Sequence, residues 1–262
     1  MSVIILDEAI VHYEALGRGR PIVFLHGWVG SWRYWMPSMQ VASTSFRAYA
    51  LDLYGYGDTT HDPLAYTLER QAGLLAAFLD EMGIGRVAIV GHGLGALVGF
   101  RFAGQRPGSV DRIMAVSSPL DVDSVNARLR TASPQELVDW LSDRTPESLA
   151  ALADASKSDP LAVPASMSSF QADGLFSEVR SGNLPCLLVY GQNDPCLRLP
   201  PTDNSTPFGQ NVHQVTLENS GHFPMLDEAA RFNRLLTDFL ALAPGLSPRH
   251  LQLKDEWKRR VR

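Results

Sequence analysis

Short apolar segments alternate with amphipathic segments along most of this 262-residue chain. The run Ile22-Val23-Phe24-Leu25 is continuously apolar, which is typical of a strand covered on both faces. Residues 67–82 carry apolar side chains at helical spacing, and Gly83 ends that segment. Further strands are expected at 46–53, 86–90, 112–117, 184–190 and 212–217, and further helices at 94–105 and 226–242. This strand-then-helix order predicts an α/β fold with a mostly parallel, doubly wound sheet.

The alternation stops after Pro119 and resumes near residue 182. The intervening stretch is rich in Ala, Ser, Asp and Leu and contains no convincing strand, while Ser133-Pro134 and Thr145-Pro146 are typical helix starts. We therefore expect a core formed by residues 1–118 and 182–245, with an inserted helical cap at 119–181.

Residues 246–262 form a basic C-terminal tail. Its last part, residues 249–262, has six basic and two acidic side chains. Leu253, Trp257 and Val261 share one helical face, which favours a terminal helix docked on the acidic body of the protein. The alternative is a contact with a partner or an anionic surface.

Composition restricts the classes of function. A net charge of −5 gives no indication of nucleic-acid binding, and no apolar stretch is long enough to span a membrane. The first residues lack the basic region of a signal peptide, so a cytoplasmic location is expected. Cys186 and Cys196 are too few for a disulfide framework and have no metal-ligand spacing. We expect no metal and no cofactor; the sequence does not predict the oligomeric state.

Residues 87–97 combine an apolar strand, a glycine-rich turn and an apolar helix. This is the context of a nucleophile elbow, whose pattern is G-x-S-x-G. The chain keeps the outer glycines, Gly91 and Gly95, but has Gly93 in place of the serine. Glycine adopts the strained backbone of such a turn without steric cost, yet it cannot form an acyl-enzyme.

Three further segments suit a hydrolytic site around this turn. Leu25-His26-Gly27-Trp28 follows a strand, and the backbone N–H groups of Trp28 and Leu94 are candidates for an oxyanion hole. Asp194 comes just after a strand, and His222 lies in a loop between a strand and a helix. Asp194 is therefore a candidate to orient His222, which would act first as base and then as acid.

The order Gly93, Asp194, His222 and the surrounding motifs resemble the α/β-hydrolase superfamily over all but the last dozen or so residues. The turn Asp52-Leu53-Tyr54-Gly55-Tyr56-Gly57 is similar to a further motif of that superfamily. The resemblance implies a sheet of about eight strands, a helical cap between strands six and seven, and a pocket beneath the cap. It also implies that Asp194 and His222 are triad members and that Gly93 marks the nucleophile position.

The expected ligand is a small apolar-to-amphipathic molecule beneath the cap. Its candidate lining consists of aromatic side chains, although aromatic residues in such helices more often belong to a core. They are Trp28, Trp140, Phe170, Phe176 and Phe223.

Other polar residues are expected to be structural. Asp52 is typical of a side chain that holds its own turn, and His12 is expected to be a packing residue. The resemblance implies that His92 points away from the reacting atom. Asp227 and Glu228 stand at the start of the last helix, where acids favour the helix dipole.

Three hypotheses follow. The first is a serine-type hydrolase of carboxylic esters whose nucleophile position is Gly93, and which is therefore inactive or altered. The second is a non-hydrolytic enzyme, such as a lyase, an isomerase or a cofactor-free oxygenase, in which His222 and Asp194 perform acid–base chemistry. The third is a pseudoenzyme that binds a small molecule without catalysis.

Overall fold

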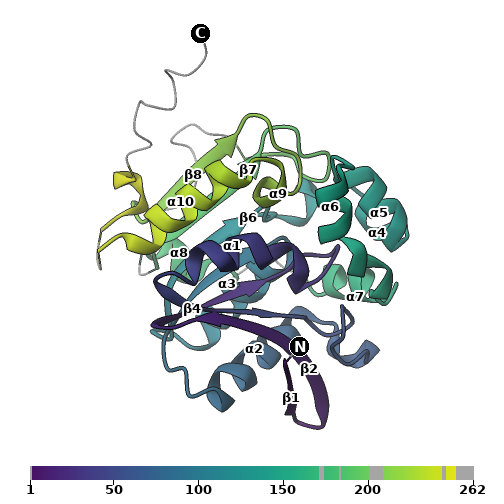
Figure 1. Ribbon diagram of the computed structural model, residues 1–262, viewed down its shortest axis with the longest axis horizontal. Helices are drawn as coiled ribbons and strands as arrows, with labels where there is room; N and C mark the ends of the chain where they lie inside the picture. Colours follow the sequence, from purple (N-terminus) through teal and green to yellow (C-terminus); the bar gives the residue numbers. More distant parts are fainter. Residues whose placement is uncertain (1, 171–173, 183, 201–208, 244–245, 252–262) are drawn as a thin grey trace.

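The computed structural model describes residues 2–170, 174–182, 184–200, 209–243 and 246–251. Leu253, Trp257 and Val261, which were expected to share a helical face, lie outside these residues. An eight-stranded sheet has the order β1-β2-β4-β3-β5-β6-β7-β8 (Figure 1). Its strands are β1 (Ser2–Leu6), β2 (Ala9–Gly17), β3 (Arg20–Leu25), β4 (Phe46–Leu51), β5 (Val87–His92), β6 (Val110–Val116), β7 (Cys186–Gly191) and β8 (Val212–Leu217).

Strand direction divides the sheet into two parts. β1 and β2 are antiparallel, as are β2 and β4, whereas all pairs from β4 through β8 are parallel. β5 and β7 are buried at every position, as expected for parallel strands covered by helices on both faces. The prediction of a mostly parallel, doubly wound α/β sheet is confirmed.

Helices cover the sheet on both faces (Figure 1). α1 (Met36–Ala42) packs against α10 (Ala229–Ala241), and α2 (Leu68–Glu81) packs against α3 (Leu94–Gln105). The short α1 was not predicted. The helix expected at 226–242 is divided into α9 (Pro224–Asp227) and α10, because Glu228 has φ −123° and ψ 52°.

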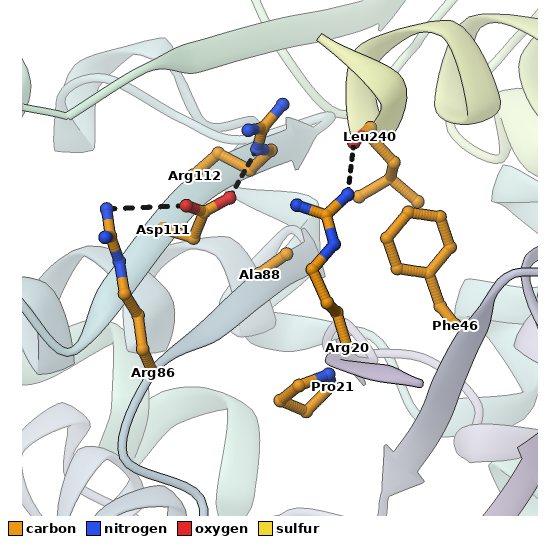
Figure 2. A pocket seen from close by; sticks show the side chains of 8 residues that line it. All are labelled: Arg20, Pro21, Phe46, Arg86, Ala88, Asp111, Arg112 and Leu240. Atoms are coloured by element: carbon orange, nitrogen blue, oxygen red, sulfur yellow. Dashed lines mark hydrogen bonds and ion pairs between the residues drawn. The ribbon is translucent and has the colours of Figure 1, made fainter. Parts of the chain in front are cut away.

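The carboxyl end of α10 lies against the first residues of the central strands. Arg112 of β6 donates to the carbonyls of Phe239 and Leu242, at 2.7 and 3.1 Å. Arg20 of β3 donates to the carbonyl of Leu240 at 3.4 Å (Figure 2). Cations at this position satisfy terminal carbonyls and offset the partial negative charge of a helix end.

The segment between β6 and β7 is helical, with no β-strand among its described residues. Ser133 forms a capping box with Glu136, and the Thr145 side chain accepts from the Ser148 N–H, so both expected helix starts are present. We call residues 119–181 the inserted segment. Its helices are α4 (Arg128–Thr131), α5 (Pro134–Leu141), α6 (Pro146–Ala151), α7 (Ala162–Ser168) and α8 (Ser177–Arg180), with a 3-10 helix at Ala153–Lys157. Among the described residues, no helix has the length and apolarity to cross a membrane.

Candidate active site

Gly93 forms the tight turn between β5 and α3. Its backbone has φ 47° and ψ −110°, a conformation that residues with a side chain rarely adopt. A Cβ atom on Gly91 would lie 2.5 Å from the Ala96 nitrogen and the Gly95 oxygen, so strand and helix approach too closely for a side chain there. Gly91 is therefore required by the turn.

Two backbone N–H groups beside Gly93 are available as donors. Gly27 lies against the turn, since its Cα would be 3.7 Å from a Cβ atom on Gly93. No described residue accepts a hydrogen bond from the N–H of Trp28 or of Leu94. Leu94 is the first residue of α3, where N–H groups have no partner within the helix and the helix dipole is positive. Donors of this kind can stabilise a developing oxyanion.

Asp194 and His222 form a buried hydrogen-bonded pair. His222 Nδ1 lies 2.9 Å from Asp194 Oδ2, and their side chains are 1% and 0% exposed. The second carboxylate oxygen accepts from the Cys196 N–H at 2.8 Å, which fixes the orientation of Asp194. His222 therefore carries its proton on Nδ1 and has Nε2 as a proton acceptor. Among the described residues, nothing is bonded to that Nε2 atom.

A chain of hydrogen bonds fixes the loop that carries His222. The His222 carbonyl accepts from His92 Nε2 at 2.9 Å and from Ser117 Oγ at 3.0 Å. His92 Nδ1 lies 2.9 Å from Tyr34 Oη, which accepts from the Gly27 N–H at 2.6 Å. Burial holds the pKa of His92 well below its usual value, so the ring is neutral, with its proton on Nε2. Tyr34 therefore donates to His92, and the chain joins three loops of the site.

The sequence did not single out Tyr34 as part of this arrangement. Its hydroxyl is 58 residues from its partner on His92. Ser117 was visible only as a serine near a loop, although its φ of 44° marks a strained position at the end of β6. A serine in that conformation is held by its bond to the His222 carbonyl.

The indole of Trp28 lies over Gly93. A Cβ atom on Gly93 would be 3.1 and 3.3 Å from Cε3 and Cζ3 of Trp28, closer than ordinary van der Waals contact. The indole N–H donates to Ser166 Oγ on α7 at 2.9 Å, and Trp28 is only 2% exposed. The inserted segment thus holds a ring next to the place where a side chain at position 93 would project.

Among the other aromatic residues expected to line a pocket, Phe223 lies at the site. Its ring centroid is 5.2 Å from that of His222. Phe176 instead packs on Phe100 of α3, with centroids 5.0 Å apart. Trp140 lies under the Arg128 guanidinium at 4.9 Å, and Phe170 is buried. A pocket role for Trp140, Phe170 and Phe176 stays a prediction.

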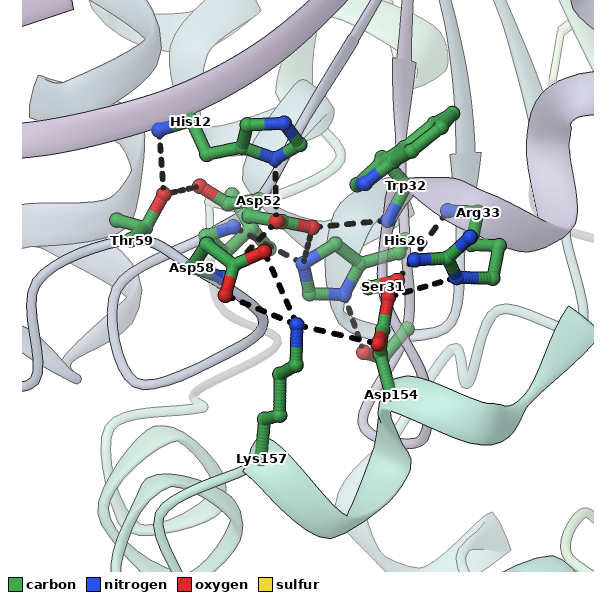
Figure 3. A network of polar contacts seen from close by, with 12 residues as sticks. His12, His26, Ser31, Trp32, Arg33, Asp52, Asp58, Thr59, Asp154 and Lys157 are labelled. Atoms are coloured by element: carbon green, nitrogen blue, oxygen red, sulfur yellow. Dashed lines mark hydrogen bonds and ion pairs between the residues drawn. The ribbon is translucent and has the colours of Figure 1, made fainter. Parts of the chain in front are cut away.

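Asp52 connects its own turn to the loop after β3 (Figure 3). Its Oδ1 accepts from the Trp32 N–H at 2.9 Å, and its Oδ2 accepts from the Asp58 N–H at 3.2 Å. The expected turn-holding role is therefore present. His12 was expected to pack, and its buried ring does pack against Trp32, with centroids 5.7 Å apart. The sequence did not predict its polar contact: His12 Nδ1 lies 2.8 Å from Asp52 Oδ2. Strand β2 brings the two together across 40 residues.

The inserted segment is also fastened by charge beside the same loop (Figure 3). Asp154 accepts from Arg33 Nε at 2.8 Å, and Lys157 contacts Asp58 at 2.9 Å and Asp154 at 3.3 Å. Arg33, Asp58 and Lys157 are partly exposed, whereas Asp154 is buried. These ion pairs therefore orient the inserted segment more than they stabilise it.

Asp227 and Glu228 hold the loop of His222 rather than serving the helix dipole alone. Asp227 accepts from the Gly221 N–H at 2.7 Å, and Glu228 accepts from the Ser220 hydroxyl at 2.9 Å. Burial raises the pKa of Asp227 to about 6. This loop is therefore fastened from both of its sides.

Within the part of the chain that the structure describes, two groups of side chains bring possible metal-ligand atoms within 4.8 Å of one another. One is Asp194, Cys196 and His222, and the other is His12, Asp52 and Asp58. Burial raises the pKa of the Cys196 thiol, so it stays protonated and is a poor ligand at neutral pH. Asp194 and His222 are already paired with each other, and this arrangement fits an acid–base dyad better than a metal centre.

A sequence model described as the alpha/beta hydrolase family matches residues 22–235. The chain belongs to this family. Epoxide hydrolase 2 of Siraitia grosvenorii is 36% identical over 110 residues, which cover 41% of this chain and only 35% of that protein. The putative carbamate hydrolase RutD of Stutzerimonas stutzeri is 24% identical over 257 residues, which cover 88% of this chain and 97% of that protein.

Solved structures of other α/β hydrolases have the same fold. A putative aryl esterase from Burkholderia cenocepacia has a TM-score of 0.77 at 22% identity, covering 91% of this chain and 97% of that one. A serine-to-glycine mutant of the N-acyl homoserine lactonase AidH, complexed with N-hexanoyl homoserine lactone, has a TM-score of 0.80 at 20% identity. That match covers 91% of this chain and 96% of the other. At these identities the likeness concerns the fold.

Proposed function

We propose that this α/β hydrolase is an esterase-type protein that recognises a small carboxylic ester or lactone, with Gly93 at the nucleophile position. The buried bond of 2.9 Å between His222 and Asp194 carries the proposal, because it keeps a base ready beside the turn. The free N–H groups of Trp28 and Leu94 support it as an oxyanion hole.

Without a side chain at position 93, the acyl-enzyme route is closed. Removing the nucleophile from such a triad lowers kcat by on the order of six decades. The protein would therefore keep its ability to bind the substrate while losing nearly all turnover. The complex of the AidH serine-to-glycine mutant with its acyl lactone supports the idea that a site with such a glycine can hold an ester.

The inserted segment at 119–181 is the proposed cap over an apolar-to-amphipathic substrate. Trp28 and Phe223 are the proposed contacts nearest to Gly93, since both rings lie against the turn or against His222. The proposed location is the cytoplasm, because the two cysteines are free thiols and fit a reducing compartment.

A second candidate function is non-hydrolytic acid–base catalysis. It is favoured by the unbonded Nε2 of His222 together with the Trp28 ring, which fills the space next to Gly93. His222 would remove a proton from the substrate itself, and the N–H groups of Trp28 and Leu94 would stabilise the resulting enolate. Lyase, isomerase or cofactor-free oxygenase chemistry fits this arrangement.

The decisive experiment restores the serine. We expect Gly93→Ser to release a burst of p-nitrophenol from p-nitrophenyl esters and to react with a fluorophosphonate probe. Gly93→Ser combined with His222→Ala is the matched control and should show neither reaction. Probe labelling of the unaltered chain would contradict the assignment of Gly93, because it would reveal another activated serine.

A folded Gly93→Ser variant that neither hydrolyses esters nor reacts with the probe would refute the esterase proposal. His222→Ala in the unaltered chain tests the second candidate, since any activity that survives this change excludes His222 as the base. Tight binding of a small molecule with no turnover in either protein would identify a binding pseudoenzyme.

A further inference from the structure

A cavity of about 250 Å³ lies at the opposite end of the sheet from Gly93, at the amino ends of the central strands (Figure 2). Arg20 begins β3, Ala88 is the second residue of β5, and Asp111 and Arg112 stand near the start of β6. The lining residues come from these strands, from β4, from the loop before β5 and from the end of α10. They are Arg20, Pro21, Phe46, Arg86, Ala88, Asp111, Arg112 and Leu240.

The cavity is positive although the whole chain has a net charge of −5. Its lining includes three arginines and one acid, Asp111. Both oxygens of Asp111 are engaged, one by Arg112 Nε at 2.6 Å and one by Arg86 Nη2 at 3.4 Å. One carboxylate thus neutralises only part of the charge of three guanidinium groups.

The three arginines differ in how many donors they have left. Arg112 is 4% exposed and is used by α10, because its Nη1 donates to two carbonyls there. Arg20 has one long bond of 3.4 Å from Nη2 and stacks on Phe46 at 5.1 Å. Arg86 is 64% exposed. For Arg20 and Arg86, no described residue accepts from Nε or Nη1, so both guanidinium groups have free donors.

Apolar walls adjoin these donors. Phe46, Pro21, Ala88 and Leu240 supply carbon surface, which suits the body of an organic molecule. The planar fork of a guanidinium matches a carboxylate with two parallel hydrogen bonds. The cavity volume of about 250 Å³ leaves room for a small ligand.

We propose that this cavity binds a small organic carboxylate with an apolar body, held by Arg20 and Arg86. The charge of Arg112 adds to the attraction while its hydrogen bonds serve α10. The proposal does not depend on the function of the site at Gly93, which lies at the other end of the strands.

Benzoate is the probe, and calorimetric titration is the measurement. We expect saturable binding to the unaltered chain, weakened about tenfold or more by Arg20→Gln combined with Arg86→Gln. The control is Arg106→Gln combined with Arg234→Gln, which removes the same charge from two exposed arginines paired elsewhere, with Asp80 and Asp238. The control should change affinity less than about twofold, as expected for distant screened charges.

Several outcomes would overturn the proposal. They are absence of saturable benzoate binding, an equal loss in the test and control variants, or tighter binding of inorganic phosphate than of benzoate. A loss of binding in His222→Ala with none in the double arginine variant would place the anion at the other site. Amide shifts of Ala88 and Arg112 on titrating the unaltered chain give a readout that needs no variant, and their absence would also contradict the proposal.

Discussion

Replacing Gly93 by alanine or serine should lower the free energy of unfolding by about 2–4 kcal/mol. A residue with a side chain at φ 47° and ψ −110° costs about 1–3 kcal/mol in backbone strain. The new Cβ atom also lies 3.1 and 3.3 Å from the Trp28 ring, so the ring must move by a few tenths of an ångström. The bond from Trp28 to Ser166 resists that movement.

Urea unfolding at equilibrium, followed by circular dichroism, measures this difference, with the dependence on urea expected to stay unchanged. In thermal unfolding, each 1 kcal/mol should lower Tm by about 2–4 °C for a chain of this size. Gly73→Ala is the matched control: Gly73 lies within α2, and a Cβ atom there would meet nothing within 4 Å. That variant should be about 0.5–1 kcal/mol more stable than the unaltered chain.

The two sources of the cost can be separated. Ser166→Ala frees the indole of Trp28, so the penalty for Gly93→Ala should shrink by about 0.5–1 kcal/mol in that background. A Gly93→Ala variant as stable as the unaltered chain would refute the reasoning, because it would mean that the turn tolerates a side chain without strain.

Three other predictions concern groups around the site. Tyr34→Phe should lower the free energy of unfolding, measured in urea, by about 2 kcal/mol or more, because it leaves the Gly27 N–H and His92 Nδ1 unpaired and buried. Tyr56→Phe should have no such effect, because no described residue bonds to that buried hydroxyl. Equal effects of the two substitutions would exclude the hydrogen-bond chain. The pKa of Asp227 is about 6 in the folded protein against an ordinary 3.8, so its contribution to stability is present below about pH 4 and is lost as the pH rises to 6. The free energy of unfolding of Asp227→Asn, relative to that of the unaltered chain, should therefore rise by up to about 3 kcal/mol between pH 4 and pH 7 in urea unfolding. A relative stability that falls with pH would contradict the raised pKa of Asp227. Burial raises the pKa of the Cys186 and Cys196 thiols, so neither should react with Ellman's reagent at pH 8 before unfolding. Rapid labelling of Cys196 would show that the loop beside Asp194 opens, whereas rapid labelling of Cys186 would show that the start of β7 opens.

Local patterns were enough to predict the central sheet. The apolar run from Ile22 to Leu25 is enough to predict a buried strand, and the glycine spacing at 91–95 is enough to predict a tight turn. In both cases burial or close packing acts on residues that are neighbours in the sequence. The short α1 has only seven residues after a 3-10 helix, which is too little for helical spacing to stand out. The break at Glu228 was missed for a different reason, since the helical spacing of apolar residues continues across it.

The candidate site was predictable where residue type and loop position coincide, as for the pair Asp194 and His222. The supporting contacts were not. His12 and Asp52 meet only because β2 pairs with β4, and that pairing has no local signal. The placement of the Trp28 ring depends on α7, whose position over the sheet follows from long-range packing.

The bond from His92 to the carbonyl of residue 222 spans 130 positions of the chain, and this has a consequence for how the protein is made. On a ribosome, the donors on His92 and Ser117 emerge long before their acceptor does. Until β7 and β8 join the sheet edge, those donors are solvated or paired with something else. The N-terminal part of the chain can therefore form strands early, whereas the geometry around Gly93 is completed only after residue 222 has been synthesised.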